Sequence, residues 1–343
     1  MSRSASDAGK QFYTEMLEFG DTLYDSWMER TESTRKKVAD YMGASEKEIA
    51  FTTNTSHSMN LVAHMLKGKG DVITMQDEFP STTFPWLNQG VHVQMVSPVD
   101  GRYPLDAIEK KLTPKTKILV TSYVQYNTGF RQDLEAIGKF CRKKDLIFVV
   151  NATQAVPVFP VDVKKMNIDF LVFTGLKWAT AGYGIGCLYI SEKYLQKEKM
   201  PFAGWQSVHE PEQMDNMKLK LRQDASMLEG GCPHFPNIFA LGGALDLFNR
   251  IGKENAAHRV LQLNRLLIEK LQQKGFELAS PTEEKHMSGI TIVKVKNPAE
   301  TVEKLREKNI IVSARGEGLR ISVSVFNNEG DVDGVVFNEI SLQ

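Results

Sequence analysis

Between residues 48 and 190, short apolar segments alternate with stretches of helical pattern, and this alternation constrains the fold more than any other feature of the sequence. Short apolar runs that alternate with helices are typical of βαβ units around a mostly parallel sheet. We therefore predict strands at residues 48–52, 71–75, 92–96, 118–122, 146–150, 170–173 and 186–190. Helices are predicted between them at residues 56–67, 106–111 and 133–143.

The pattern changes near residue 235, where long amphipathic helical patterns begin. The elements predicted from there on are helices at residues 238–251, 254–274 and 298–308 and strands at residues 289–295 and 319–325. Because 343 residues exceed what one hydrophobic core usually holds, we expect two domains. We predict a large α/β domain at residues 20–235 and a smaller α+β domain that consists of residues 236–343 together with the N-terminal segment 1–19.

The charge balance excludes several classes of partner. The chain has 42 basic and 42 acidic side chains, so its formal net charge is +0. Nucleic acids and anionic membrane surfaces demand a basic surplus, so neither is an expected partner. The three cysteines lie far apart and the histidines lack ligand spacing, so we expect neither a disulfide framework nor a metal site. Without a signal-peptide pattern or an apolar run of about 18 residues, the chain is predicted to be cytoplasmic.

Polar side chains follow two predicted strands, at the edge where open α/β sheets bind ligands. Asn151 and Gln154 come after one strand, and Thr174 and Lys177 come after the next. A lysine followed by a tryptophan and a glycine-rich turn can be desolvated, which lowers its pKa and makes its amine nucleophilic. The alternative is an ordinary solvated lysine, and Lys177 alone does not distinguish the two.

Several motifs occur along the chain in order. They are the stretch at residues 146–190, FTTNTSHSMN at residues 51–60, the segment at residues 123–138, LEGGCP at residues 228–233, and LRIS with NNEGD within residues 319–331. Together they resemble the class V aminotransferase family over nearly the whole chain. The resemblance implies an α/β fold of the fold type I class, with a mostly parallel sheet in a large domain and a smaller α+β C-terminal domain. It also implies pyridoxal 5′-phosphate (PLP) as cofactor.

The resemblance assigns the residues that would do the chemistry. Lys177 would bind the cofactor aldehyde covalently and later carry the substrate's Cα proton. Gln154 would hydrogen-bond the phenolic oxygen of the cofactor. Arg320 would hold the substrate carboxylate by a bidentate contact. Arg315 would meet a second acidic group of the substrate, or it is a solvated loop charge; both readings stay open.

The same resemblance assigns the cofactor phosphate to the helix that starts near residue 56. Ser56 and the backbone N–H groups of Thr55 and His57 would hold it, because free amides and the helix dipole favour an anion there. Thr174 would add a hydroxyl. The family forms homodimers with sites at the interface, so Cys232 would reach the phosphate of the neighbouring subunit.

The chain departs from the family at several of these positions. Asn151 stands where the family has an aspartate that pairs with the protonated pyridine nitrogen. A neutral amide supplies no charge to keep that nitrogen protonated, so we predict slow or absent transamination. Phe79 replaces a histidine that stacks on the ring, Tyr126 replaces a frequent asparagine, and Cys232 replaces a threonine.

We therefore predict a PLP-dependent enzyme that acts on an amino acid or related amine, with transamination, elimination and epimerisation left open. The alternative is a relative with impaired or no catalysis that keeps the fold for binding or regulation. Desulfurase activity is not expected, because desulfurases need a thiol shortly before the carboxylate-binding arginine. The matching residues 311–318, IVSARGEG, contain no cysteine.

Overall fold

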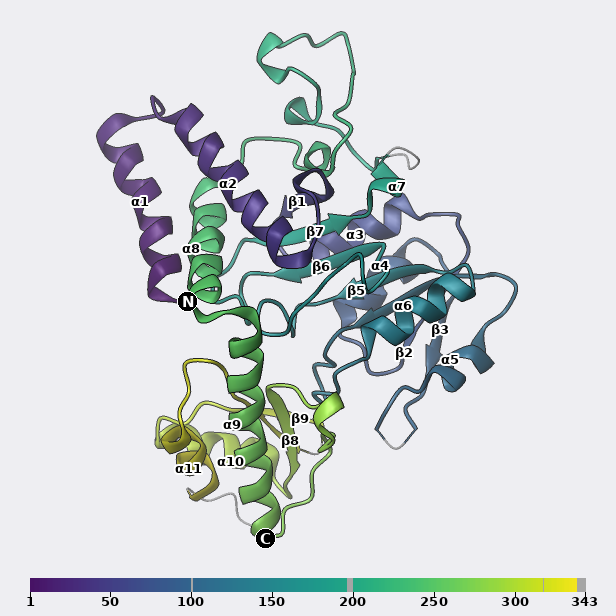
Figure 1. Cartoon of the computed structure of the whole chain (residues 1–343), viewed down its shortest axis with the longest axis vertical. Coiled ribbons are helices and arrows are strands. Elements are labelled where there is room, and N and C mark those ends of the chain that lie inside the picture. Colours follow the sequence, from purple (N-terminus) through teal and green to yellow (C-terminus); the bar gives the residue numbers. More distant parts are fainter. Residues whose placement is uncertain (100, 196–199, 317, 338–343) are drawn as a thin grey trace.

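The large sheet is the framework of the molecule (Figure 1). The computed structural model describes residues 1–99, 101–195, 200–316 and 318–337. Seven strands form the large sheet in the order β1-β7-β6-β5-β4-β2-β3. They are β1 (Ile49–Thr52), β2 (Asp71–Met75), β3 (Val93–Val96), β4 (Thr116–Ser122), β5 (Ile147–Asn151), β6 (Phe170–Thr174) and β7 (Gly186–Ile190).

One strand of the large sheet runs against the others. β7 is antiparallel to its neighbours β1 and β6, whereas β6-β5, β5-β4, β4-β2 and β2-β3 are parallel pairs. The mostly parallel sheet predicted from the sequence is therefore confirmed. The parallel strands share one carboxyl edge, and the loops after them meet there.

Both faces of the large sheet are covered, which explains why its strands are apolar throughout. In β5, Phe148 and Val150 belong to one hydrophobic cluster and Val149 to another, since successive side chains point to opposite faces. The helices of this part are α1 (Arg3–Phe19), α2 (Tyr24–Met42), α3 (Thr55–Met65), α4 (Pro80–Asn88), α5 (Leu105–Lys111), α6 (Leu134–Lys143), α7 (Glu192–Leu195) and α8 (Phe235–Ile251).

Helix α1 lies along α8 through small residues (Figure 1). A Cβ on Gly9 would come within 3.2 Å of the Pro236 carbonyl oxygen, and one on Gly243 within 2.4 Å of the Ser4 carbonyl oxygen. The two helix backbones therefore approach closely, and glycine at these positions allows it.

A second, smaller sheet follows the long helix α9 (Lys253–Gln273). Its order is β8-β10-β9, all antiparallel, from β8 (Ile290–Lys294), β9 (Ser313–Arg315) and β10 (Gly318–Ser322), with α10 (Pro298–Glu307) and α11 (Glu329–Phe337) beside it. Its hydrophobic cluster draws on α9 from Leu263 onward, whereas α8 shares the cluster of the large sheet. The division of the chain at residue 235 stays a prediction, and residues 338–343 of the predicted small domain lie outside the described residues.

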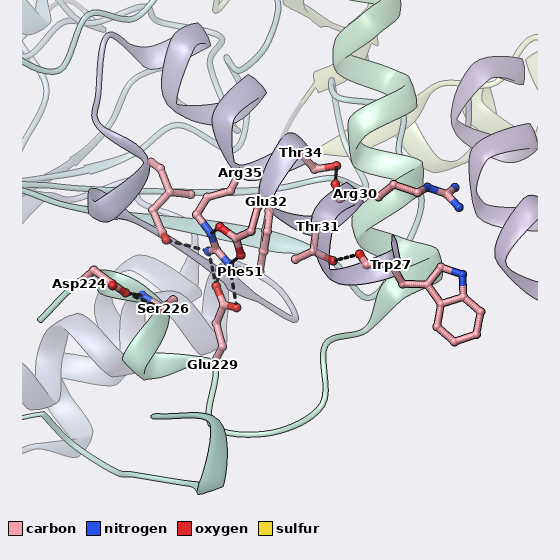
Figure 2. A network of polar contacts seen from close by, with 11 residues as sticks. Trp27, Arg30, Thr31, Glu32, Thr34, Arg35, Phe51, Asp224, Ser226 and Glu229 are labelled. Carbon is pink, nitrogen blue, oxygen red and sulfur yellow. Dashed lines mark hydrogen bonds and ion pairs between the residues drawn. The ribbon is translucent and has the colours of Figure 1, made fainter. Parts of the chain in front are cut away.

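A buried ion pair between Arg35 and Glu229 links the LEGGCP loop, residues 228–233, to the large sheet (Figure 2). Arg35 on α2, only 4% exposed, donates to Glu229 Oε1 at 2.5 Å and Oε2 at 3.1 Å, and to the Ile49 carbonyl at 2.9 Å. Glu229 Oε1 also accepts from the Phe51 N–H at 2.8 Å. The pair thus joins α2, β1 and the loop that carries Cys232.

Candidate active site

The carboxyl ends of the strands open onto a cavity of about 300 Å³. Ser122 ends β4, Asn151 ends β5 and Thr174 ends β6, and all three line this cavity. Thr55 follows β1 and Phe79 follows β2, and both line it as well. The sheet topology therefore brings together side chains that are far apart in the sequence.

The N-terminus of α3 borders the cavity. Asn54 caps the helix, because its side-chain oxygen accepts from the His57 N–H at 2.9 Å. Thr55 and Ser56 are the first two helical residues, so their N–H groups have no acceptor within the helix. The Thr55 hydroxyl is 2.7 Å from that of Thr153. Two free amides at a helix start suit an anionic ligand.

The amide side chains of Asn151 and Gln154, which line the cavity, are each oriented by hydrogen bonds. Asn151 Nδ2 donates to Thr82 Oγ1 at 2.9 Å, and Asn151 Oδ1 accepts from the Thr153 N–H at 3.1 Å. Gln154 Oε1 accepts from Trp178 Nε1 at 2.9 Å, which leaves the Gln154 amide nitrogen as the end available to a ligand. Gln154 therefore offers a donor, and Asn151 offers a neutral amide.

All charged side chains that line the cavity are cationic: Lys177 after β6, Arg315 on β9 and Arg320 on β10. Among the residues that the structure describes, no aspartate or glutamate lines it. Desolvation, Arg320 and then Arg315 lower the pKa of Lys177. This favours the uncharged, nucleophilic amine. Burial and Arg315 likewise lower the pKa of Arg320, so the two guanidinium groups are arranged to receive an anion.

The two sheets meet at the cavity through Tyr126 and its loop. Arg320 Nη1 donates to the Tyr126 carbonyl at 3.3 Å. Gly129, at φ +72°, lies so close to the small sheet that a Cβ would be 2.2 Å from the Ile290 carbonyl oxygen. The Tyr126 ring packs edge-on against Phe79, with centroids 5.2 Å apart, and Phe79 is 49% exposed. Phe79 therefore presents an apolar surface to this site.

Not every predicted residue lies in this cavity. His57 and Cys232 line a second cavity of about 510 Å³, and Cys232 is exposed. Thr174 does line the first cavity, but its hydroxyl donates to the Ile185 carbonyl at 3.1 Å. The phosphate contacts proposed for these three residues stay predictions.

Asn54, Ser81, Ser122 and Thr153 also line the cavity, although no role was predicted for them. Ser122 ends β4 and Thr153 lies two residues after the end of β5, so the rule that selected Asn151 could have found them. Asn54 was recognisable as the cap that precedes the helix. Ser81 carries no comparable signal.

The described part of the chain contains neither a candidate metal site nor a candidate membrane-spanning helix. No group of three or more His, Cys, Asp or Glu side chains comes together there to hold a metal ion. No helix among the described residues is long and apolar enough to cross a membrane.

Comparison with known proteins gives a consistent picture. A probable cysteine desulfurase of Pyrococcus abyssi is 29% identical over 83% of this chain and 73% of its own length. An uncharacterized aminotransferase of Bacillus subtilis, YcbU, is 24% identical over 97% of this chain and 89% of its own. The apo structure of a cysteine desulfurase from Thermococcus onnurineus superimposes with a TM-score of 0.90 at 26% identity, covering 98% of this chain and 90% of that one.

The mostly parallel sheet, with a lysine at its carboxyl edge beside a helix start, is that of a fold type I PLP-dependent enzyme, as the likeness to the cysteine desulfurase structure shows. The chain belongs to the class V aminotransferase family, since the family model described as "Aminotransferase class-V" matches residues 3–335. The cavity fits PLP, because it combines the Lys177 amine, a helix start whose first amides have no acceptor within the helix, and the Gln154 donor. Arg320 adds a buried Nε without a partner among the described residues.

Proposed function

We propose that this PLP enzyme converts an amino acid whose α-carboxylate binds Arg320, with Lys177 as the group that bonds to the cofactor and moves the Cα proton. The observation that carries the proposal is that Lys177, Gln154, Asn151 and Arg320 line one cavity whose charged residues are all cationic. When bound, PLP supplies an electron sink for the bonds to the substrate Cα.

The chain's own residues divide the remaining work. The start of α3, with Thr55 and Ser56, holds the phosphate, and Gln154 donates to the phenolic oxygen. Lys177 with its lowered pKa is a base at lower pH than an ordinary lysine, which suits it to take up a proton at its Nζ. Phe79 excludes water from one side of the site.

Asn151 sets the limit of this chemistry. Its amide carries no charge, so the ring nitrogen lacks the direct carboxylate that the family supplies. We propose that transamination is slow for this reason, and that the enzyme can still catalyse elimination or epimerisation. A chain that binds PLP but converts no amino acid would favour the binding or regulatory alternative.

Desulfuration through a protein thiol is not part of the proposal. Cys141 and Cys187 are buried, and burial raises the pKa of both thiols. Cys232 is exposed but lines the second cavity, not the one with Lys177. The word desulfurase in the names of the relatives therefore describes those proteins and is not carried over to this chain.

The proposal is tested by reconstitution. The purified chain is incubated with PLP, reduced with borohydride and mapped by mass spectrometry. A yellow protein labelled at Lys177 is the expected result. A colourless protein that takes up no PLP would overturn the proposed function.

Asn151→Asp is expected to raise the rate of an aminotransferase half-reaction by about 10-fold, because a carboxylate favours the protonated ring by about one pKa unit or more. Single-turnover absorbance with a panel of amino acids measures it. Thr153→Ser, a conservative change beside it, is the control. An unchanged or lower rate in Asn151→Asp would contradict the assigned role.

Arg320→Gln is expected to weaken amino-acid binding by about 10- to 100-fold, because a charge-assisted hydrogen bond contributes roughly 1.5–3 kcal/mol.

Arg315→Gln is expected to act mainly on amino acids with a second acidic group, since Arg315 lines the same cavity. KM values for one-carboxylate and two-carboxylate amino acids separate the two effects. Equal behaviour of both substrates in Arg315→Gln would make Arg315 a solvated loop charge.

A further inference from the structure

Trp178, which directly follows Lys177, packs between the loop after β5 and the small sheet, and the proposed chemistry gives it no role. The residue is buried, with 7% of its surface exposed. At one end of the indole ring, Nε1 donates to Gln154 Oε1 at 2.9 Å. At the other end, a Cβ on Gly289 would come within 2.4 Å of Cη2 and 2.8 Å of Cζ3. The ring is therefore held from both ends.

The small sheet supplies one of these two contacts. Gly289 immediately precedes β8, and its carbonyl accepts from the Val323 N–H at 2.9 Å. This hydrogen bond continues the antiparallel pairing of β8 with β10, so the backbone at Gly289 is fixed by the sheet. Because Cη2 and Cζ3 lie on the side of the ring away from Nε1, this backbone limits the movement of Trp178 away from Gln154.

The indole N–H determines which way the Gln154 amide faces. An indole nitrogen donates and does not accept, whereas an amide has one accepting end and one donating end. With Oε1 facing Trp178, Nε2 is the end left for a ligand in the cavity that Gln154 lines. The reversed amide would set two donors against each other and leave a buried N–H without an acceptor, which is unfavourable.

We propose that Trp178 is a positioning residue that holds the Gln154 amide with its nitrogen toward the phenolic oxygen of the cofactor. The inference rests on the proposed function, in which Gln154 donates to that oxygen. A donor at this position stabilises the deprotonated phenol, whereas the amide oxygen in its place would repel the negative charge. Acting through Gln154, Trp178 thereby lowers the pH at which the bound cofactor loses its proton.

Other titratable side chains bear on the test. In the described part of the chain, those that line the cavity together with Gln154 are Tyr126, Lys177, Arg315 and Arg320. Desolvation, Arg320 and then Arg315 lower the pKa of Lys177. All four side chains are kept in every variant below, and none of the substitutions changes a charge. A change in the pH midpoint is therefore not caused by the loss of a charged group.

The test measures the pH midpoint of the cofactor's absorbance in full-length chains loaded with PLP. Trp178→Phe keeps an aromatic ring but removes the N–H, and it is expected to raise the midpoint by about one unit, the size of one hydrogen bond to a charged group. Gln154→Ala is expected to raise it by a similar amount. In a Gln154→Ala chain, Trp178→Phe is expected to add nothing further, because Trp178 acts through Gln154.

The matched control is Trp86→Phe. Trp86 on α4 is fully buried, and its Nε1 has no hydrogen-bond partner among the described residues. The control removes the same atoms from the protein interior and is expected to keep the wild-type midpoint. Trp178→Met, whose flexible side chain fills irregular gaps and carries no N–H, replaces Trp178→Phe in the test if that variant does not fold.

The outcomes separate this inference from the proposed function. A wild-type midpoint in Trp178→Phe, with PLP still bound, would overturn the inference and leave the proposed function intact. A shift that persists in full in the Gln154→Ala chain would also overturn it, since Trp178 would then act by another route. So would a shift of equal size in Trp86→Phe, which would make the effect one of packing. A wild-type chain that takes up no PLP would overturn both proposals.

Discussion

Lys177→Ala is expected to abolish covalent capture of PLP and to slow any conversion of an amino acid by about 10³-fold or more. The variant removes both the amine that bonds to the cofactor and the group that moves the Cα proton, and acid–base catalysis alone contributes about 10²–10⁴-fold. Borohydride reduction followed by peptide mass spectrometry measures capture, and single-turnover kinetics measures conversion.

The matched control is Lys139→Ala. Lys139 is an exposed lysine on α6 that pairs with Glu135 at 2.8 Å and lies outside the cavity. It is expected to retain capture and turnover. Borohydride-stable label in Lys177→Ala at wild-type level would show that another amine binds the cofactor, and would contradict the assignment.

Arg35→Met is expected to lower the free energy of unfolding by about 3–5 kcal/mol. The change leaves the Glu229 carboxylate partly buried without its guanidinium, and an uncompensated buried charge is strongly destabilising. Urea unfolding of the full chain without cofactor measures the difference.

Two companion variants sharpen that prediction. Glu229→Gln added to Arg35→Met is expected to recover part of the loss, because glutamine removes the charge and can still accept from the Phe51 N–H. Lys36→Met breaks an exposed pair with Asp40 on the same helix and is expected to cost less than about 1 kcal/mol. A loss in Arg35→Met as small as that of Lys36→Met would contradict a structural role for the buried pair.

The large sheet was predictable because its strands carry an unambiguous pattern. β2 and β7 have the bounds that their apolar runs predict, and β5 is shifted by one residue, from the predicted 146–150 to 147–151, so that it includes Asn151. Helices α1, α2 and α4 were not predicted. α1 buries only Ala5 completely and depends on close contact with α8, which is a property of the tertiary structure and not of local pattern.

Some residues of the site could likewise be predicted from the sequence, whereas others could not. Asn151 and Thr174 end their strands and Gln154 and Lys177 follow them, so a general rule for parallel sheets selects all four. Arg320 comes from the other sheet, and only the resemblance to a family indicated that it belongs here.

The contact between Arg320 and the Tyr126 carbonyl joins residues 194 positions apart, and both residues line the cavity. Contacts of such long range form late, since a large loop must be ordered before they are made. Because a ligand that binds only the native state adds to its stability, about 2.7 kcal/mol at 100 times its Kd, PLP is expected to raise the free energy of unfolding of this chain.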